Sequence, residues 1–227
     1  MQETIKLYIL IFFIYAIAGW IMESTMISIK NKKFVNRGFL IGPICPIYGY
    51  GVVLISILLK KYQDDMIITF FMSIIICGVL EYFTSFFMEK IFHARWWDYS
   101  KRKFNINGRI CLENLILFGF ASCFIVYIAN PFIMQKIKLI PDFIQTIIIV
   151  VLLIIHIIDN IISYKIILNL KQVSSEIQDN TIEISEKVKS IIHNKSIFHR
   201  RLVNAFPNIK ERVEFKKWTK RKKQEKY

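Results

Sequence analysis

The hydrophobic residues of this chain fall in long uninterrupted blocks and do not alternate with polar residues. Several blocks approach the roughly 20 residues that a helix needs to cross a bilayer. The pattern predicts an all-α, polytopic membrane helix bundle with five transmembrane helices at about residues 5–29, 43–60, 66–89, 110–130 and 142–167. The first block is too long for the apolar part of a signal peptide, and no small-residue cleavage pattern follows it, so we expect it to remain as a helix.

The second block is the shortest, and Gly and Pro interrupt it. Residues 42–51 contain three Gly and two Pro. Pro removes a backbone donor, and Gly loosens a helix. Broken backbone is tolerated in hydrocarbon only where protein or a water-filled cavity satisfies its polar groups. We therefore expect a broken or re-entrant second span, which forms one wall of a polar pocket.

The basic residues are distributed unevenly between the two ends of the expected spans. Of 31 Lys and Arg residues, 26 fall in segments 30–37 and 90–109 or follow residue 164. Basic residues accumulate on the cytoplasmic side of a membrane. We therefore expect a multi-pass protein of the plasma (cytoplasmic) membrane with its N-terminus outside and its C-terminus in the cytoplasm.

The chain divides into a transmembrane helix bundle, residues 1–168, and a cytoplasmic amphipathic and basic tail, residues 169–227. Apolar positions recur at helical spacing over 171–195, which fits either a helix lying on the membrane or a seam that forms a homodimer. From Phe198 the tail carries 11 Lys and Arg residues with interleaved aromatics. For a segment tethered to a bilayer this pattern favours anionic lipid, and we expect no nucleic acid partner.

Three acids lie within expected spans, where charge is costly and usually marks a bundle interior or a functional site. From a rise of about 1.5 Å per residue, Glu23 lies roughly 9 Å inside its helix end, and Glu81 and Asp159 lie roughly 12 Å inside theirs. All three then share the inner-leaflet half. Ser85 and Glu89 continue from Glu81 at four-residue spacing and make one polar stripe.

Two further groups of polar residues adjoin this layer. His156 shares a helix face with Asp159, so the two can hydrogen-bond, or both can point into the bundle; a lone His on an apolar helix is more often a core residue. The run Arg95-Trp96-Trp97-Asp98-Tyr99 is either an interfacial aromatic belt or a structured cap. In a cap, Arg37, Arg95 and Arg109 are available to pair with the acids.

Catalytic and metal-binding motifs are absent from the sequence. The four Cys residues show no metal spacing and read as small buried apolar residues. There is no nucleophile–base pair at recognisable spacing. The chain lacks the Walker A motif, so it cannot hydrolyse ATP in that manner. We expect no catalytic residue, no metal and no cofactor.

Five motifs together resemble a bacterial membrane family labelled type IV ABC-transporter permeases, the CmpB-like group. The motifs are Gly19-Trp20-x-x-Glu23, Asn36-Arg37-Gly38 leading to Gly42-Pro43-x-x-Pro46-Ile47-Tyr48-Gly49-x-Gly51, Glu81-Tyr82-x-x-Ser85-x-x-x-Glu89, Arg95-Trp96-Trp97-Asp98-Tyr99, and Phe104-Asn105-x-x-Gly108-Arg109-Ile110. The resemblance covers about residues 5–131, with a weaker echo through Asp159 to Pro207. It implies the membrane part of an ABC-type transporter, served by a separate ATPase subunit that docks on cytoplasmic loops or the tail.

We therefore expect a permease-like subunit with a polar pocket in the inner-leaflet half and a substrate that the sequence does not name. Two alternatives stay open: a non-catalytic membrane regulator or scaffold acting through its basic tail, and a lipid-headgroup-binding membrane protein or enzyme. The expected substrate-binding residues are Glu23, Arg37, Gly42, Pro43, Pro46, Tyr48, Glu81, Ser85, Glu89, Arg95, Trp96, Asp98, Tyr99, Asn105 and Arg109, with His156 and Asp159 as a second tier.

Overall fold

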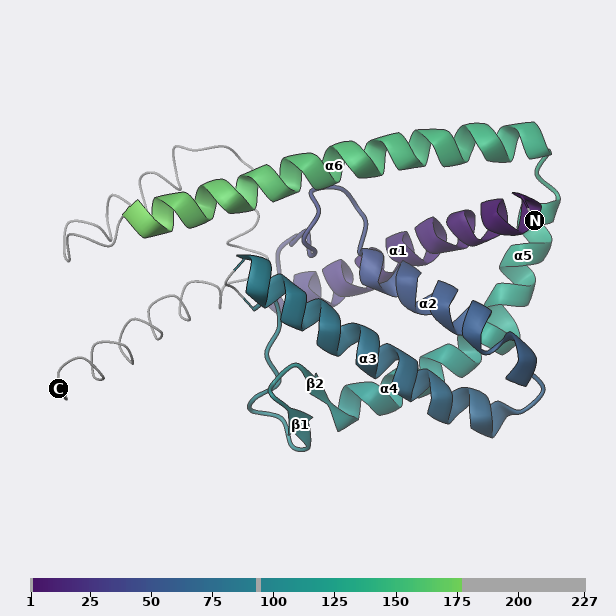
Figure 1. Ribbon diagram of the computed structural model, residues 1–227, viewed down its shortest axis with the longest axis horizontal. Helices are drawn as coiled ribbons and strands as arrows, with labels where there is room; N and C mark the ends of the chain where they lie inside the picture. Colours follow the sequence, from purple (N-terminus) through teal and green to yellow (C-terminus); the bar gives the residue numbers. More distant parts are fainter. Residues whose placement is uncertain (1, 93–94, 177–227) are drawn as a thin grey trace.

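The computed structural model describes residues 2–92 and 95–176, and these residues are mostly helical (Figure 1). The helices are α1 (Gln2–Asn31), α2 (Pro46–Leu58), α3 (Met66–Phe92), α4 (Leu112–Phe124), α5 (Asn130–Lys138) and α6 (Asp142–Glu176). A 3₁₀ turn (Lys60–Tyr62) follows α2, and a π-helical turn (Ile125–Ala129) joins α4 to α5. Strands β1 (Asn105–Ile106) and β2 (Ile110–Cys111) form a small antiparallel hairpin.

Within the described part of the chain, four helical stretches are long and apolar enough to cross a membrane: α1, α3, α4 continued through α5, and α6 as far as Ile166. Helix α2 is apolar but has only 13 residues. At about 1.5 Å per residue it spans roughly 20 Å, short of the roughly 30 Å of a hydrocarbon core. The predicted membrane helix bundle with a broken second span is therefore confirmed.

The fourth span runs further than the sequence predicted. The helix was expected to end near residue 130, whereas it continues to Lys138. Pro131 cannot donate a backbone hydrogen bond, and one wider π-helical turn before it absorbs the misfit. Helix α5 consequently leaves α4 in a new direction (Figure 1). Asn130 fixes this bend by donating to the Ser56 hydroxyl at 2.9 Å.

Local sequence sets two further helix ends. Asp65 caps the start of α3, since its carboxylate accepts the backbone N–H groups of Ile67 and Ile68 at 2.9 and 3.0 Å. Helix α1 ends at Asn31, and the next residue, Lys32, adopts φ +50°. The N–H groups of Lys32 and Lys33 close a Schellman motif on the carbonyls of Ile29 and Ser28. This C-cap turns the chain sharply back toward α1.

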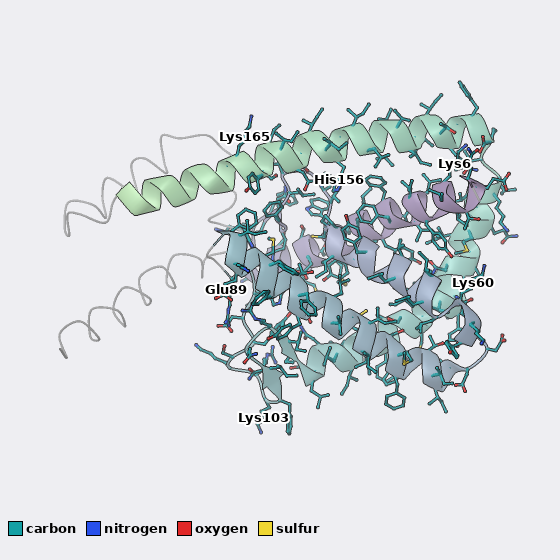
Figure 2. All side chains as sticks on the ribbon, in the orientation of Figure 1. Lys6, Lys60, Glu89, Lys103, His156 and Lys165 are labelled. Atoms are coloured by element: carbon teal, nitrogen blue, oxygen red, sulfur yellow. The ribbon has the colours of Figure 1, made fainter. Side chains whose placement is uncertain are left out.

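The helices run back and forth between two ends of the bundle. Helix α1 packs mainly on α2, α3 packs mainly on α4, and α6 lies along one side (Figure 1). The N-terminus and the α5–α6 junction lie at one end, and the end of α3 and the hairpin lie at the other. In Figure 2, Lys6 and Lys60 stand at the first end, and Glu89 and Lys103 stand at the second. The basic segments 30–37 and 95–109, far apart in the sequence, thus lie at the hairpin end.

Helix α6 continues past the predicted domain boundary at residue 168 and is described to Glu176. Side chains are described as far as Ile166. The predicted amphipathic segment beyond Glu176 and the basic run from Phe198 lie outside the described residues.

Candidate functional site

Residues 33–45, which we call the return segment, run back along α1 without regular secondary structure. Helix α1 holds them at positions spaced four residues apart on one face. The bonds are Val35 N–H to Ser28 Oγ (2.9 Å), Arg37 N–H to Ser24 Oγ (3.1 Å), Trp20 Nε1–H to Asn36 Oδ1 (2.7 Å) and Cys45 N–H to the Ala16 carbonyl (2.9 Å). The broken backbone inside the bundle is therefore satisfied by protein groups, as hydrocarbon surroundings require.

Helix α6 holds the same segment from the other side. The Asp159 carboxylate accepts the backbone N–H of Ile41 through one oxygen and the N–H of Gly42 through the other, each at 2.9 Å. Ser163 donates to Asp159 at 3.1 Å. Asp159 is buried, and its two oxygens serve the return segment, so its clearest role is to position that segment. Of the two alternatives that the sequence left open, a hydrogen bond to His156 or a carboxylate directed into the bundle, Asp159 follows the second and bonds the backbone of the return segment.

His156 points from α6 toward α1 (Figure 2). Its ring meets the rings of Phe12 and Phe13 edge-on, with centroids 5.9 and 5.7 Å away. The Asn160 amide lies against the same ring. These contacts are those of a core histidine in an aromatic setting.

Tyr48, near the start of α2, lies flat against Gly19 of α1. A Cβ atom at Gly19 would collide with the Tyr48 ring, so only glycine admits the tyrosine there. One turn along α1, Glu23 accepts the Tyr48 hydroxyl at 2.7 Å. Arg37 of the return segment places its Nε atom 3.7 Å from the other Glu23 oxygen. The motif Gly19-x-x-x-Glu23 thus provides both the space and the acceptor for one side chain.

Glu81 in the middle of α3 is buried, with 6% of its surface exposed. Tyr99 donates to Glu81 Oε1 at 3.1 Å, and Glu81 Oε2 has no hydrogen-bond partner among the residues that the structure describes. Burial raises the pKa of the Tyr99 hydroxyl well above its usual range, and the charges of Glu81 and Glu23 raise it further. Glu23 and Glu81 therefore both lie within electrostatic reach of Tyr99. We call Glu23, Tyr48, Glu81 and Tyr99 the polar cluster.

An ion-paired network at the end of α3 secures the hairpin segment, residues 95–111. Glu89 Oε2 accepts Arg95 Nε at 2.7 Å and lies 2.8 Å from Arg109 Nη2. Arg109 also donates to the Ser85 hydroxyl at 3.3 Å, and its guanidinium lies over the Phe86 ring. The predicted stripe of Glu81, Ser85 and Glu89 faces this one segment. Both arginines bond to groups within the protein, which favours a positioning role over headgroup binding.

The remaining predicted residues of the hairpin segment shape its loop. Asn105 accepts the backbone N–H of Gly108, which has φ +66°, and donates to the Arg102 carbonyl at 2.7 Å. Asp98 Oδ1 lies 3.8 Å from Arg95 Nη1 and accepts the backbone N–H of Ser100 at 3.0 Å. These contacts fix the turn that carries Arg109 toward α3.

The aromatic residues of this run form a structured cap. Trp96 is buried against Val35 and Phe92, which joins the hairpin segment to the return segment. Trp97 donates its indole N–H to the Arg109 carbonyl at 3.0 Å. Of the two readings of the sequence, a lipid-facing belt and a cap, the structure has the cap.

The predicted site residues do not all meet at one point. Pro43 is exposed, and Pro46 serves as the first residue of α2, where a missing N–H costs nothing. Gly42 is engaged with Asp159 rather than with the polar cluster. A cavity of about 230 Å³ lies along α1, and none of the predicted site residues lines it. Its lining residues are Trp20, Ile21, Ser24, Thr25, Ser28, Ile29 and Phe34.

Several residues that hold the site were not predicted. Ser24 and Ser28 orient the return segment, Ser163 supports Asp159, and Tyr82 accepts the Asn107 amide at 2.9 Å. Ser24 and Ser28 lie four residues apart on one face of an apolar helix, and this spacing could have predicted that they bond a neighbouring segment. Within residues 2–92 and 95–166, whose side chains are described, no group of three or more His, Cys, Asp and Glu residues could hold a metal ion, and all four cysteines are free.

Comparison with known proteins addresses identity at the level of the family. No curated protein and no solved structure matches this chain. The sequence signature of one family matches residues 10–164, which is more than half of the 227 residues and contains the return segment, the polar cluster and the hairpin segment. This chain therefore belongs to the family described as "putative ABC-transporter type IV", named ABC_trans_CmpB.

Proposed function

We propose that this protein is the permease-like membrane subunit of an ABC-type transporter and that its substrate binds at the polar cluster. The observation that carries this proposal is Glu81, a buried acid whose Oε2 atom lacks a hydrogen-bond partner beside a broken span. Acids within membrane helices and discontinuous helices are typical of substrate pathways. The family membership supports the same reading.

In this proposal the site residues divide into two roles. Glu23, Tyr48, Glu81 and Tyr99 contact the substrate, because their polar atoms converge between α1, α2, α3 and the hairpin segment. The others keep those four side chains in place through the contacts described above. This supporting set is Arg37, Gly42, Pro43, Pro46, Ser85, Glu89, Arg95, Trp96, Asp98, Asn105 and Arg109, with His156 and Asp159 behind the return segment.

The chain itself has no Walker A motif, so ATP hydrolysis requires a separate subunit. We place its docking surface at the hairpin end of the bundle. There Phe104 is 79% exposed at φ +50°, a backbone conformation that costs energy for a bulky residue and often accompanies function. Lys101, Arg102 and Lys103 precede it and are also exposed.

We further propose that the hairpin end faces the cytoplasm at the plasma membrane, with the N-terminus outside. The proposal extends to residues 169–227 as a cytoplasmic tail that contacts anionic lipid, and to a homodimer that encloses the path. A single cysteine placed at Lys103 should react with a membrane-impermeant maleimide only in opened cells, and one at Lys60 should react in intact cells. The reverse pattern would invert the topology.

Co-purification tests the transporter assignment. The tagged chain, extracted from its native membranes in mild detergent, should elute with a Walker A protein identified by mass spectrometry and with vanadate-sensitive ATP hydrolysis. Phe104→Asp should remove both. Leu139→Asp is the matched control, since Leu139 is similarly exposed, at 74%, beside α5 at the opposite end of the bundle. Absence of any ATPase from the wild-type eluate would refute the proposed function.

A further inference from the structure

Glu81 differs from the other acids around it in having no basic partner. Glu23 is accompanied by Arg37, and Glu89 is accompanied by Arg95 and Arg109. Among the residues that the structure describes, Glu81 makes no ion pair, and its one hydrogen bond comes from the neutral hydroxyl of Tyr99. The Oε2 atom is fully buried and unpartnered.

The groups that face Glu81 from neighbouring elements add no positive charge. Helix α1 contributes Glu23, a second acid, and α2 contributes Tyr48 beside it. The hairpin segment contributes Tyr99, with Cys111 close to it. Within α3, Cys77 lies one turn away. Glu81 is therefore surrounded by acids, hydroxyls and thiols.

A count of the charged side chains shows how much positive charge the site lacks. Glu23 and Glu81 carry two negative charges, and Arg37 carries one positive charge that is already directed at Glu23. Among the residues that the structure describes, one negative charge stays uncompensated inside the bundle, where an unpaired ion is costly. A single positive charge supplied from solution would remove that cost, and carboxylate and phenolic oxygens are the groups that hold hard cations.

We propose that Glu81 and the Tyr99 hydroxyl, with the Glu23–Tyr48 pair beside them, bind one small monovalent cation, either a proton or an alkali metal ion. The charge count excludes a divalent ion, which would leave the site with a net positive charge. Bound at Glu81, the cation would lie where the hairpin segment meets α3. The inference shares its site with the proposed function but does not require an ATPase, so failure of the co-purification experiment would leave it intact.

Carbodiimide labelling reads this site directly. Dicyclohexylcarbodiimide reacts with a carboxyl group that carries a proton in apolar surroundings: the O–H adds across one C=N bond, and the adduct rearranges to a stable N-acylurea. Purified wild-type protein is labelled in choline chloride and digested, and the peptides are weighed. We expect the adduct at Glu81 and none at Glu89, whose carboxylate is held by two arginines on the same helix.

Two series of labelling reactions, one with different salts and one at different pH, identify the cation. If sodium, lithium or potassium chloride suppresses labelling severalfold relative to choline chloride, the ligand is an alkali ion. If the salts have no effect and alkaline buffer alone suppresses labelling, the ligand is a proton. Either result supports the site.

Thermal unfolding is the second readout. Labelling requires that dicyclohexylcarbodiimide physically reach Glu81, whereas unfolding does not depend on that access. Glu81→Gln keeps an oxygen acceptor for Tyr99 and removes the charge. The wild-type Tm should shift with pH or with alkali salt, and the shift of Glu81→Gln across the same series should be clearly smaller, with only the alkaline decline that Tyr99 causes. Coincident profiles of the two proteins, together with no more adduct at Glu81 than at Glu89, would overturn the proposal. If Glu81→Gln does not fold, labelling of the wild type decides alone.

Discussion

Asp159 of α6 accepts the backbone N–H of Gly42 at 2.9 Å across 117 residues of sequence. The other oxygen of the same carboxylate accepts the N–H of Ile41, so one side chain satisfies two donors of the broken span. Asp159→Asn would replace one acceptor oxygen with an NH₂ group that opposes a buried donor. We expect the free energy of unfolding in detergent to fall by about 1–3 kcal/mol.

The same substitution elsewhere on α6 provides the control. Asp142 pairs with Lys6 at 2.8 Å, but its side chain is 68% exposed. Exposed pairs contribute roughly 0–1 kcal/mol, so Asp142→Asn should leave the midpoint of unfolding nearly unchanged. An equal loss of unfolding free energy in the two variants would show that the bonds from Asp159 to the return segment do not stabilise the fold.

Gly19 is expected to tolerate no side chain, because the Tyr48 ring occupies the position of its Cβ atom. Gly19→Ala should displace Tyr48 and break its bond to Glu23, at a cost of about 1–3 kcal/mol typical of overpacking. Gly51→Ala is the matched control in α2, since the nearest atom to its Cβ position is Leu80 Cδ2 at 3.7 Å, an ordinary contact. That variant should be neutral or stabilising by up to about 1 kcal/mol. Thermal melts of both proteins in one detergent measure the difference.

Arg109 should contribute far more to stability than Arg102 of the same hairpin segment, although each lies 2.8 Å from a carboxylate. Arg109 is buried against Glu89, whereas Arg102 and Glu113 are both more than half exposed. Arg109→Gln should cost about 2–3 kcal/mol, below the full loss of a buried pair because Glu89 keeps Arg95. Arg102→Gln should cost no more than about 1 kcal/mol. Chemical denaturation that ranks them equally would contradict this assignment.

Tyr99 links stability to alkaline pH. In the folded protein, burial and the nearby carboxylates raise the pKa of Tyr99. In the unfolded chain a tyrosine ionises near its reference pKa of about 10. Above that pH the unfolded chain binds fewer protons than the folded one, so stability falls as pH rises. Below it the contribution of Tyr99 is fully present.

Tyr99→Phe cannot ionise and should show a shallower alkaline decline, measured as Tm against pH. At neutral pH it should lose about 1 kcal/mol, the usual net contribution of one hydrogen bond. Tyr62→Phe is the control, since Tyr62 is exposed at the opposite end of the bundle. Its pH profile should match that of the wild type. A Tyr99→Phe profile that also matches would remove Tyr99 as the source.

Much of the fold was readable from local pattern. Long apolar blocks predicted the spans, because a helix in hydrocarbon must bond its own backbone. The Gly and Pro residues of 42–51 predicted the broken second span for the same reason. The fourth span was predicted too short: it was expected to end near residue 130, and a π-helical turn before Pro131 carries the helix to Lys138. Such a rescue depends on neighbouring packing that a sequence window does not contain.

The site was only partly readable. Acids inside the spans and arginines in the segments between them indicated that ion pairs could form, but the sequence left open which acid pairs with which arginine. Tertiary structure assigned two arginines to Glu89 and left Glu81 with a tyrosine. It also directed Asp159 to the backbone of Ile41 and Gly42, a bond that the spacing of Asp159 and His156 on one helix face did not indicate.

The sequence by itself determined what the chain must bury and which groups it must satisfy: apolar helices, a broken span, and charges too costly to leave in hydrocarbon. These follow from composition and spacing within single elements, where physical rules act locally. Which donor meets which acceptor was decided only by the packing of α1, α3 and α6 around the return segment. A hydrogen bond across 117 residues depends on distances of a few tenths of an ångström, and only the assembled bundle sets those.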